Sequence, residues 1–157
     1  MRGRQRMNKS IRKAVRCFLI KDDKVVAIKY KEGNNKDYYD IPGGKIEENE
    51  TSIQAAIREF KEETGIEITN PIKIGKSYIE CPNLIFDLDL FIVDEYKGEP
   101  QKFYENDSGW IEIDNLLKQE KKLPTIELLK YINKGNKINI KISADEKHNI
   151  KYLTTNL

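Results

Sequence analysis

The chain has 157 residues, of which 38% are hydrophobic and 34% are charged, and its formal net charge is +2. This length predicts one domain with a buried core, and no apolar run reaches the ~18 residues that a membrane-spanning helix requires. The N-terminal residues lack the apolar stretch of a signal peptide, and Cys17 and Cys81 match no metal or redox spacing. We therefore expect a cytoplasmic protein with free thiols and no membrane partner.

The first 16 residues carry seven basic side chains and no acidic one. A nucleic-acid-binding arm and a solvated tail are both consistent with this charge. The segment contains no aromatic side chain that could stack on a base, which favours the solvated tail. We assign residues 1–12 to a basic, flexible tail and residues 13–136 to the folded domain, and we do not expect nucleic acid as a partner.

Three short stretches before residue 42 are rich in apolar and β-branched residues and predict strands. They are residues 14–20, 24–30 and 38–41. Polar residues predict a turn at 21–23 and a loop at 33–36. The third stretch runs into Gly43 and Gly44, whose lack of a side chain lets the backbone approach a ligand closely.

A helix is predicted between Thr51 and Gly65. Thr51 is a suitable N-cap, Gln54 completes a capping box, and Gly65 suits the position just past the helix end. At ~100° per residue, four apolar side chains form one stripe that we expect to face the core. They are Ile53, Ala56, Ile57 and Phe60.

Three glutamates share another face of this helix, clear of the apolar stripe, because they lie at i, i+3 and i+4 spacing. They are Glu59, Glu62 and Glu63. Like charges at this spacing repel each other, so a bound cation would stabilise the cluster. Carboxylate oxygens suit Mg²⁺ or Mn²⁺, and such sites usually act on phosphates. Arg58 precedes Glu62 by four residues and can pair with it.

The segment from Gly44 to Ile66 resembles the Nudix box in every fixed position. That pattern is Gly, five residues, Glu, seven residues, Arg-Glu, an aliphatic or aromatic residue, any residue, Glu-Glu, any residue, Gly and an aliphatic residue. A solvated, salt-bridged helix with Arg58 and Lys61 as counter-charges would also explain the glutamates. It would not explain Glu50 and the glycines at their set distances. The resemblance implies the Nudix fold, a mixed β-sheet sandwiched between helices.

The resemblance also implies a role for each polar residue of the box. The metal ligands would be Glu59, Glu62, Glu63 and the Gly43 carbonyl, and the metal would be Mg²⁺ or Mn²⁺. Arg58 would orient these catalytic glutamates, and Glu50 would support them from behind. In some members of the family, the catalytic base lies outside the box, on a loop after the long strand. Glu105 is our candidate here, with Glu99 and Asp107 as neighbouring loop acids.

Beyond the box, strand-like stretches again outnumber helices. Strands are predicted at residues 68–78, 84–93 and 109–113, and the first is broken near Asn70-Pro71. Pro124 precedes a second predicted helix at residues 125–134. Strands and helices do not alternate strictly, which is typical of the α+β class.

Residues 137–157 form a C-terminal extension that lies beyond the usual Nudix core. Isoleucines alternate with other residues at 138–142, residues 144–147 can turn, and residues 150–153 resume the apolar pattern. This pattern predicts a β-hairpin. The hairpin could serve as an extra sheet edge, as a contact in a homodimer or as a lid.

Nudix enzymes hydrolyse a nucleoside diphosphate linked to another moiety, so the resemblance implies a divalent-metal-dependent pyrophosphohydrolase with a nucleotide-type substrate. The run from Gly98-Glu99-Pro100 to Trp110 resembles the MutT-type branch, which converts a (deoxy)nucleoside triphosphate to a monophosphate and pyrophosphate. Lys29 falls where that branch has a basic phosphate contact. The region around Pro124 and Thr125 lacks the asparagine with which that branch reads an oxidised guanine.

Other substrates therefore stay open, including ADP-ribose, nucleotide sugars and dinucleoside polyphosphates. The alternative of another class is a non-catalytic Nudix-fold protein that binds a nucleotide, but such proteins have degenerate boxes and this box is intact. Four aromatic side chains are candidates for stacking on the base of a nucleotide. They are Tyr39, Tyr78, Phe91 and Trp110.

Overall fold

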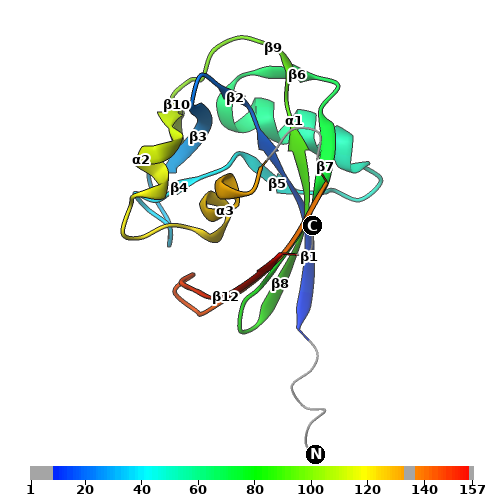
Figure 1. Cartoon of the computed structure of the whole chain (residues 1–157). Coiled ribbons are helices and arrows are strands. Elements are labelled where there is room, and N and C mark those ends of the chain that lie inside the picture. The colour runs from blue at the N-terminus through cyan, green and yellow to red at the C-terminus, as the bar shows by residue number, and fades with distance from the viewer. Residues whose placement is uncertain (1–8, 133–136, 156–157) are drawn as a thin grey trace, which may run out of the picture.

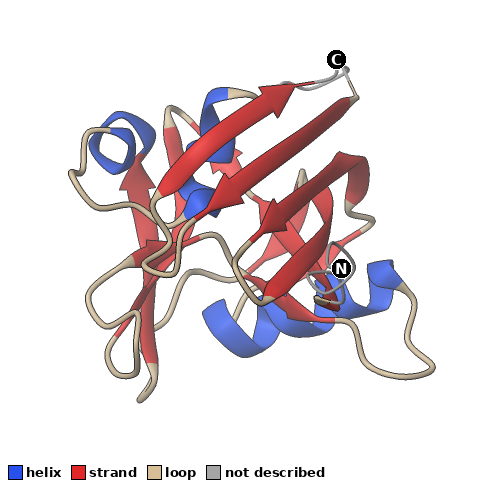
Figure 2. Cartoon of the chain, turned by 90° about the horizontal axis from the view of Figure 1, so that it is seen from below, coloured by secondary structure: helices blue, strands red, loops and turns tan. Residues whose placement is uncertain are grey.

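The protein, as a computed structural model, is described over residues 9–132 and 137–155 and is built around a six-stranded mixed sheet (Figures 1 and 2). From one edge to the other, its strands are β12 (Ile150–Thr155), β11 (Ile138–Ala144), β7 (Ile72–Glu80), β8 (Leu84–Ile92), β1 (Ser10–Phe18) and β5 (Gly43–Lys45). β11 pairs with β7 and β1 pairs with β8 in parallel, while the other neighbours are antiparallel.

A smaller sheet lies apart from the large one. It contains β10 (Asn106–Glu112), β3 (Lys24–Tyr30), β2 (Ile20–Lys21) and, also paired with β3, β4 (Tyr39–Asp40). A separate ribbon pairs β6 (Glu67–Thr69) with β9 (Glu95–Lys97). The helices are α1 (Ser52–Thr64), α2 (Ile113–Leu117) and α3 (Pro124–Glu127), and a 3₁₀ turn over Leu128–Lys130 follows α3.

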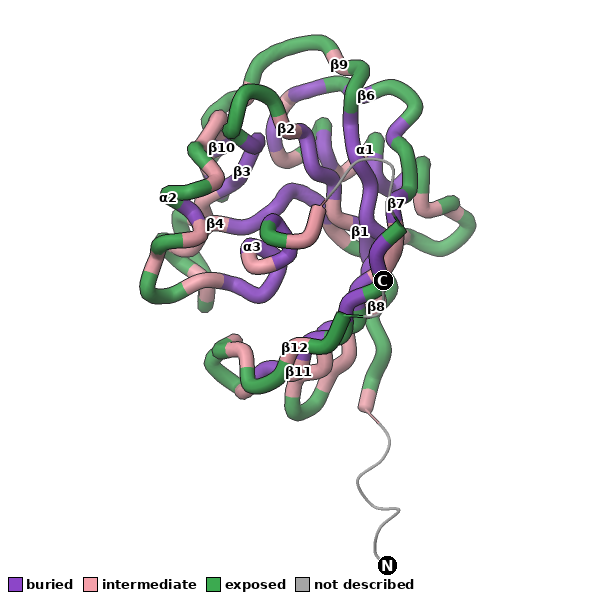
Figure 3. The backbone as a smooth tube through the Cα atoms, in the orientation of Figure 1, coloured by how far each residue is buried: buried purple, intermediate pink, exposed green. Residues whose placement is uncertain are grey.

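Two apolar cores form on the two faces of the large sheet, and the buried residues follow its central strands (Figure 3). On one face, Phe60 of α1 belongs to the same core as Val15 of β1 and Phe91 of β8. On the other face, Leu116 of α2 and Ile126 of α3 share a core with residues of both sheets. The predicted α+β class, with a mixed sheet between helices, is therefore confirmed.

Most strand predictions agree with the structure, but the strand predicted at residues 109–113 is displaced, because β10 spans Asn106–Glu112 and Ile113 begins α2. Some short elements were not predicted. Residues 68–78 split at Asn70-Pro71 into β6 and β7, as expected. β9 and α2 have three and five residues, which is too short for a hydrophobic period to appear. The helix predicted at residues 125–134 is wrong in length, because the chain tightens into a 3₁₀ turn in which Tyr131 N–H donates to the Leu128 carbonyl. Residues 133 and 134 lie outside the described residues.

The predicted C-terminal hairpin is confirmed, and its first strand joins the large sheet. Ile138, Ile140 and Ile142 are buried in the core that also contains Leu116 and Ile126, so the hairpin extends the large sheet. At the other end of the chain, residues 10–12, which we expected in the tail, are the first residues of β1. Residues 1–8 of the predicted tail lie outside the described residues.

Two further observations bear on the environment of the protein. Cys17 is buried and Cys81 is half-buried, and both are free thiols. In the ranges that the structure describes, no helix is both long enough and apolar enough to cross a membrane. A homodimer stays a prediction.

Candidate active site on helix α1

Helix α1 has at both ends the caps that its sequence predicts. The Thr51 hydroxyl accepts a hydrogen bond from the Gln54 N–H at 3.1 Å, and the Gln54 side chain accepts one from the Thr51 N–H at 2.9 Å. Gly65 adopts the left-handed conformation, with φ of 81°, and its N–H donates to the Lys61 carbonyl. The capping box and the terminal glycine are thus confirmed, and they fix where the helix begins and ends.

The buried face of α1 differs from the predicted apolar stripe. Ala56 and Phe60 are buried as expected, but Ile53 and Ile57 are 48% and 37% exposed. Ala55 is fully buried in their place. The prediction is wrong for the two isoleucines because the small alanines let the helix lie close to the sheet, which turns the larger side chains outward.

This orientation places part of the acidic cluster against the protein. The Glu59 side chain is 15% exposed, whereas that of Glu62 is 57% exposed. Glu59 lies over Gly44, where an added Cβ would be 1.6 Å from Glu59 Oε2. Glu63 accepts a hydrogen bond from the Gly43 N–H at 2.8 Å. The glutamates therefore do not all stand clear of the buried face, because the glycine pair lets strand β5 approach the helix.

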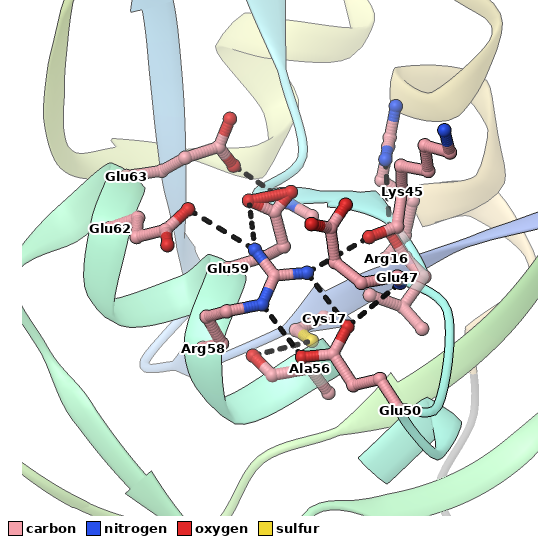
Figure 4. A network of polar contacts seen from close by, with 12 residues as sticks. Arg16, Cys17, Lys45, Glu47, Glu50, Ala56, Arg58, Glu59, Glu62 and Glu63 are labelled. Carbon is pink, nitrogen blue, oxygen red and sulfur yellow. Dashed lines mark hydrogen bonds and ion pairs between the residues drawn. The ribbon is translucent and has the colours of Figure 1, made fainter. Parts of the chain in front are cut away.

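Arg58 lies at the centre of the acidic cluster (Figure 4). Its guanidinium donates to both carboxylate oxygens of Glu50, with distances of 2.7 Å from Nε and 2.8 Å from Nη2. Nη1 lies 3.2 Å from Glu62 Oε1 and 3.3 Å from Glu59 Oε1. Nη2 also donates to the Lys45 carbonyl at 3.0 Å. The predicted pairing of Arg58 with Glu62 is present, and the planar fork holds the guanidinium in one orientation.

The site shifts the pKa values of its carboxyl groups in opposite directions. The hydrogen bonds from Arg58 lower the pKa of Glu50 to about 2. Burial, aided by the neighbouring Glu62, raises the pKa of Glu59 to about 7. Burial also raises the pKa of Glu63 to about 8. The negative charges of these two glutamates are therefore not fully compensated within the protein, which favours a bound cation.

The oxygens of this cluster suit a hard divalent cation. Carboxylate and backbone carbonyl oxygens are the ligands that Mg²⁺ and Mn²⁺ prefer. Within the described residues, no group of three or more acidic, histidine or cysteine side chains is arranged to hold a metal ion by itself. A cation here would therefore complete its shell with water and substrate oxygens, as Mg²⁺ commonly does. The ligand roles of Glu59, Glu62, Glu63 and Gly43 stay predictions.

Glu105 lies at the edge of the acidic cluster. It lines the same surface hollow as Glu62, and its side chain is exposed. The Glu105 carbonyl accepts a hydrogen bond from the Lys31 N–H at 3.0 Å. Next to it, Asn106 Nδ2 donates to the Glu63 carbonyl at 3.0 Å and fastens this loop to the end of α1. The structure thus brings the predicted base close to the cluster, although its role stays a prediction.

Two of the four aromatic candidates for base stacking lie away from this cluster. Phe91 is fully buried in the core beneath α1, so its prediction as a stacking residue is wrong. Its position in β8 directs it to the face that the helix covers. Trp110 has its ring centroid 6.2 Å from that of Tyr96 and donates from Nε1 to Glu99 at 3.3 Å. In the described part of the chain, the hollow that Trp110 lines includes none of the box glutamates.

The other two aromatic candidates each lie beside a lysine. Tyr78 on β7 is 39% exposed, and Lys76 Nζ lies 5.6 Å from the centroid of its ring. Tyr39 on β4 is partly buried against the core that α2 and α3 share with both sheets, and Lys29 Nζ lies 5.4 Å from the centroid of the Tyr39 ring. Tyr39 and Lys29 are also paired in the small sheet, where β4 precedes the glycine pair Gly43-Gly44.

A cavity of about 130 Å³ was not predicted from the sequence. It is lined by Arg16, Tyr30, Asn35, Asp40, Ile79, Cys81, Phe86, Leu88, Leu123, Pro124, Thr125 and His148. These residues come from both sheets, α3 and the turn of the C-terminal hairpin, so no local pattern could indicate the cavity. The local signal that was available is Asp40, an acid between the apolar residues of a short strand.

Asp40 is the centre of the polar part of this cavity. Its Oδ2 accepts a hydrogen bond from the Tyr30 hydroxyl at 2.7 Å, and its Oδ1 accepts one from the Ile41 N–H at 2.8 Å. The Thr125 hydroxyl also donates to Oδ1. A buried carboxylate with this many partners is held rigidly, so these groups form a fixed polar floor beside apolar walls.

Arg16 of β1 connects the cavity with the acidic cluster. It lines the cavity, and its Nε lies 3.8 Å from Asp40 Oδ1. Burial tends to lower the pKa of Arg16, but the negative charges of Asp40 and Glu63 are among those that raise it overall. Within the described residues, the buried Nε has no hydrogen-bond partner. A guanidinium in this position is suited to bind a phosphate group that lies between the cavity and α1.

Together, the fold and the site define an α+β protein whose acidic helix is suited to phosphate chemistry. The sequence matches the NUDIX domain over residues 10–131, and the chain therefore belongs to the Nudix family. It is 30% identical over 118 residues to an uncharacterised Nudix hydrolase of Bacillus subtilis, an alignment that covers 68% of this chain and 69% of that protein.

Further similarities cover parts of known proteins or their fold. The chain is 39% identical over 62 residues to the 8-oxo-dGTP diphosphatase of Proteus vulgaris, an alignment that covers 40% of this chain and 55% of that protein. It thus spans about half the length of that relative. Among solved structures, the MutT protein of Bacillus halodurans matches with a TM-score of 0.78 and 20% identity, over 92% of this chain and 97% of that one. At this identity, the structural likeness shows the fold alone.

Proposed function

We propose that this chain hydrolyses a phosphoanhydride bond in a nucleoside diphosphate that is linked to another moiety. The observation that carries the proposal is the acidic face of α1, where Arg58 positions Glu59 and Glu62 beside the glycine pair of β5. Hydrolases of this family generally need a divalent metal, and we propose Mg²⁺ or Mn²⁺. The free thiols fit our proposal that the enzyme acts in the reducing cytoplasm.

The cavity and the acidic cluster suggest how the substrate lies. We place the nucleoside in the cavity around Asp40, because apolar walls with a few fixed polar groups are typical of such a pocket. The diphosphate would then extend past Arg16 to the glutamates of α1. Lys29 of β3 and Tyr39 of β4 are paired in the small sheet, and we propose that Lys29 contacts a phosphate. Tyr39 does not line the cavity, so a nucleoside placed there leaves its predicted role in base stacking without support.

Each polar residue of the box then has a distinct task. A bound divalent cation would neutralise the diphosphate and make a water molecule more nucleophilic. The groups that would hold this cation are Glu59, Glu62, Glu63 and the Gly43 carbonyl. Arg58 keeps the first two in place, and Glu50 fixes Arg58. Glu105, at the edge of the hollow beside Glu62, would accept a proton from the attacking water.

Within this class, we favour a (deoxy)nucleoside triphosphate as substrate, with a monophosphate and pyrophosphate as products. The similarity to an 8-oxo-dGTP diphosphatase supports this choice. The region around Pro124 and Thr125 lacks the asparagine with which the MutT-type branch reads an oxidised guanine, and the Thr125 hydroxyl is engaged with Asp40, so we do not extend the proposal to oxidised guanine. ADP-ribose and nucleotide sugars are the next candidates.

The test is a substrate panel of nucleoside triphosphates, ADP-ribose, nucleotide sugars and dinucleoside polyphosphates, scored by kcat/KM with Mg²⁺ and with Mn²⁺. We expect hydrolysis of at least one class, complete loss of activity with EDTA, and recovery when the metal is added back. Glu62→Gln serves as the matched inactive control. Nucleotide binding without turnover on the whole panel would instead identify a non-catalytic binding protein.

A further inference from the structure

The turn of the C-terminal hairpin, residues 145–149, is rigidly built. The Asp145 carboxylate accepts hydrogen bonds from the Lys147 N–H and the Asn149 N–H, both at 2.9 Å. Asn149 Nδ2 also donates to it at 3.3 Å. His148 has φ of 67°, a left-handed conformation that histidine tolerates better than most residues. The backbone of this turn therefore holds His148 in place without help from its side chain.

Through His148, this turn reaches the cavity that Asp40 and Thr125 also line. Ile142 pairs with Ile79 in the parallel ladder between β11 and β7, and Ile79 itself lines the cavity. The hairpin thus brings His148 to a pocket whose other polar residues all lie at position 125 or earlier in the sequence. His148 is half-buried there and lines the cavity together with Asp40 and Thr125.

The polar groups of the cavity differ in whether they are already engaged. The hydroxyl groups of Tyr30 and Thr125 both donate hydrogen bonds to the Asp40 carboxylate. Within the part of the chain that the structure describes, the side chains of His148 and Asn35 form no hydrogen bond or ion pair. An imidazole and an amide can both donate and accept, so these two side chains, besides the guanidinium of Arg16, can form hydrogen bonds with a ligand.

The shape and polarity of the cavity indicate which part of a nucleotide it takes. Its volume of about 130 Å³ is below the ~300 Å³ at which pockets for whole ligands begin, so it suits a single moiety. Leu88, Leu123 and Phe86 supply apolar walls against which a heterocyclic base can pack. The Asp40 carboxylate disfavours a phosphate at this position, because like charges repel.

We propose that the hairpin turn forms one wall of a nucleobase site and that His148 is a specificity-determining residue, which hydrogen-bonds the polar edge of the base. Asn35 contributes a second hydrogen bond from the loop after β3. This inference rests on the proposed function for the identity of the ligand as a nucleotide. It gives the C-terminal extension a role in substrate choice in addition to its place at the edge of the sheet.

The test compares His148→Gly with a matched control in the same turn. Glycine keeps the left-handed backbone at position 148 and removes only the imidazole. Lys147→Gly introduces the same flexibility one residue earlier, where the side chain does not line the cavity. His148→Asn keeps a polar group in a left-handed position. Equal melting temperatures of the two glycine variants establish that the turn is intact in both.

For the best substrate, we expect His148→Gly to raise KM about tenfold with kcat nearly unchanged, as the loss of one hydrogen bond in binding predicts. The differences in KM among substrates with different bases should become smaller in His148→Gly. Lys147→Gly should have the KM of the wild type, and His148→Asn should have an intermediate KM. Calorimetry with nucleoside monophosphates in metal-free buffer should show the same order of Kd values.

The outcomes separate this inference from the proposed function. If the wild type turns over no substrate but monophosphate Kd values rise in His148→Gly alone, the proposed function fails and the base site stands. If turnover is found and the two glycine variants have equal KM, base preference and Kd, the base site is overturned and the proposed function stands. If no monophosphate binds the wild type, the base site is also overturned.

Discussion

Arg58 and Glu50 form a bidentate ion pair that connects helix α1 to the loop after β5, with distances of 2.7 Å (Nε–Oε2) and 2.8 Å (Nη2–Oε1). Glu50 also accepts a hydrogen bond from the Glu47 N–H at 2.9 Å, so the loop closes on the pair. Since Arg58 in turn reaches Glu59 and Glu62, the geometry of the acidic cluster depends on a carboxylate outside it.

The first prediction concerns this positioning role of Glu50. Glu50→Gln removes the charge that orients Arg58, and we expect kcat to fall by roughly 10–100-fold, the range typical of residues that orient metal ligands. The concentration of Mg²⁺ needed for half-maximal activity should rise, which a purely structural defect would not cause. Glu48→Gln, at an exposed position in the same loop, is the control and should leave both quantities unchanged.

The second prediction concerns the glutamates themselves. Glu62→Gln and Glu63→Gln each remove a charge that we expect to hold the cation, so kcat should fall by about 10²-fold or more, by analogy with other preorganised electrostatic groups. The metal-free melting temperature should hold or rise, because repulsion within the cluster is relieved. A variant with wild-type turnover, or one that is unfolded at room temperature, would show that its glutamate has a structural role instead.

The third prediction tests which face of α1 is buried. Phe60→Ala should destabilise the protein by roughly 3 kcal/mol or more, because a fully buried aromatic side chain is truncated. Lys61→Ala should change stability by at most about 0.5 kcal/mol, since the Lys61 side chain is 60% exposed. Chemical denaturation measures both. Ile53→Ala should also cost little, and a loss as large as that of Phe60→Ala would restore the apolar stripe expected from the sequence.

The case of Ile53 shows which part of the site could be predicted from sequence. The capping box, Gly65 and the spacing of the glutamates follow local rules, and the structure has the first two as predicted. The rotation of α1 depends on how closely Ala55 approaches the sheet, which is a tertiary property that an apolar pattern weighted toward isoleucine cannot capture. The cavity depends on residues as distant as Arg16 and His148, which only the completed sheet brings together.

The fourth prediction is the pH dependence of stability without metal. Burial raises the pKa of Glu59 to about 7 and that of Glu63 to about 8, above the value of 4.5 for an unperturbed glutamate. The folded state therefore binds these protons more tightly than the unfolded state does, so their stabilising contribution is full below pH 4.5 and is lost as pH rises through 7 to 8. In EDTA, we expect the melting temperature to fall by several degrees between pH 5 and pH 8.

Glu63→Gln provides the control for this titration, because the amide carries no charge while its oxygen can still accept the hydrogen bond from Gly43. The fall in melting temperature between pH 5 and pH 8 should be smaller in this variant. Glu50 does not interfere, because its pKa is lowered to about 2 and its contribution is lost only as pH falls from 4.5 toward that value. An identical slope in wild type and Glu63→Gln would show that Glu63 does not titrate in this window.

The last prediction concerns Glu105, the proposed base. Glu105→Gln should lower kcat with little change in KM, the pattern of an interaction made mainly in the transition state, and the acidic limb of the pH–rate profile should shift or disappear. Glu99→Gln and Asp107→Asn are matched controls. Glu99 bonds to Trp110 outside the hollow, and Asp107 pairs with Lys31.

The three loop variants together decide where the base lies. A loss confined to Glu105→Gln supports the position beside Glu62 that the hollow provides. A loss of activity confined to Asp107→Asn would identify Asp107 as the base, and its ion pair with Lys31 would then have to break before it accepts a proton. Equal behaviour of all three would mean that the loop acids only form a charged surface. Because Glu59 carries a pKa of about 7 and lies within the cluster, it would then be the next carboxylate to test as the base.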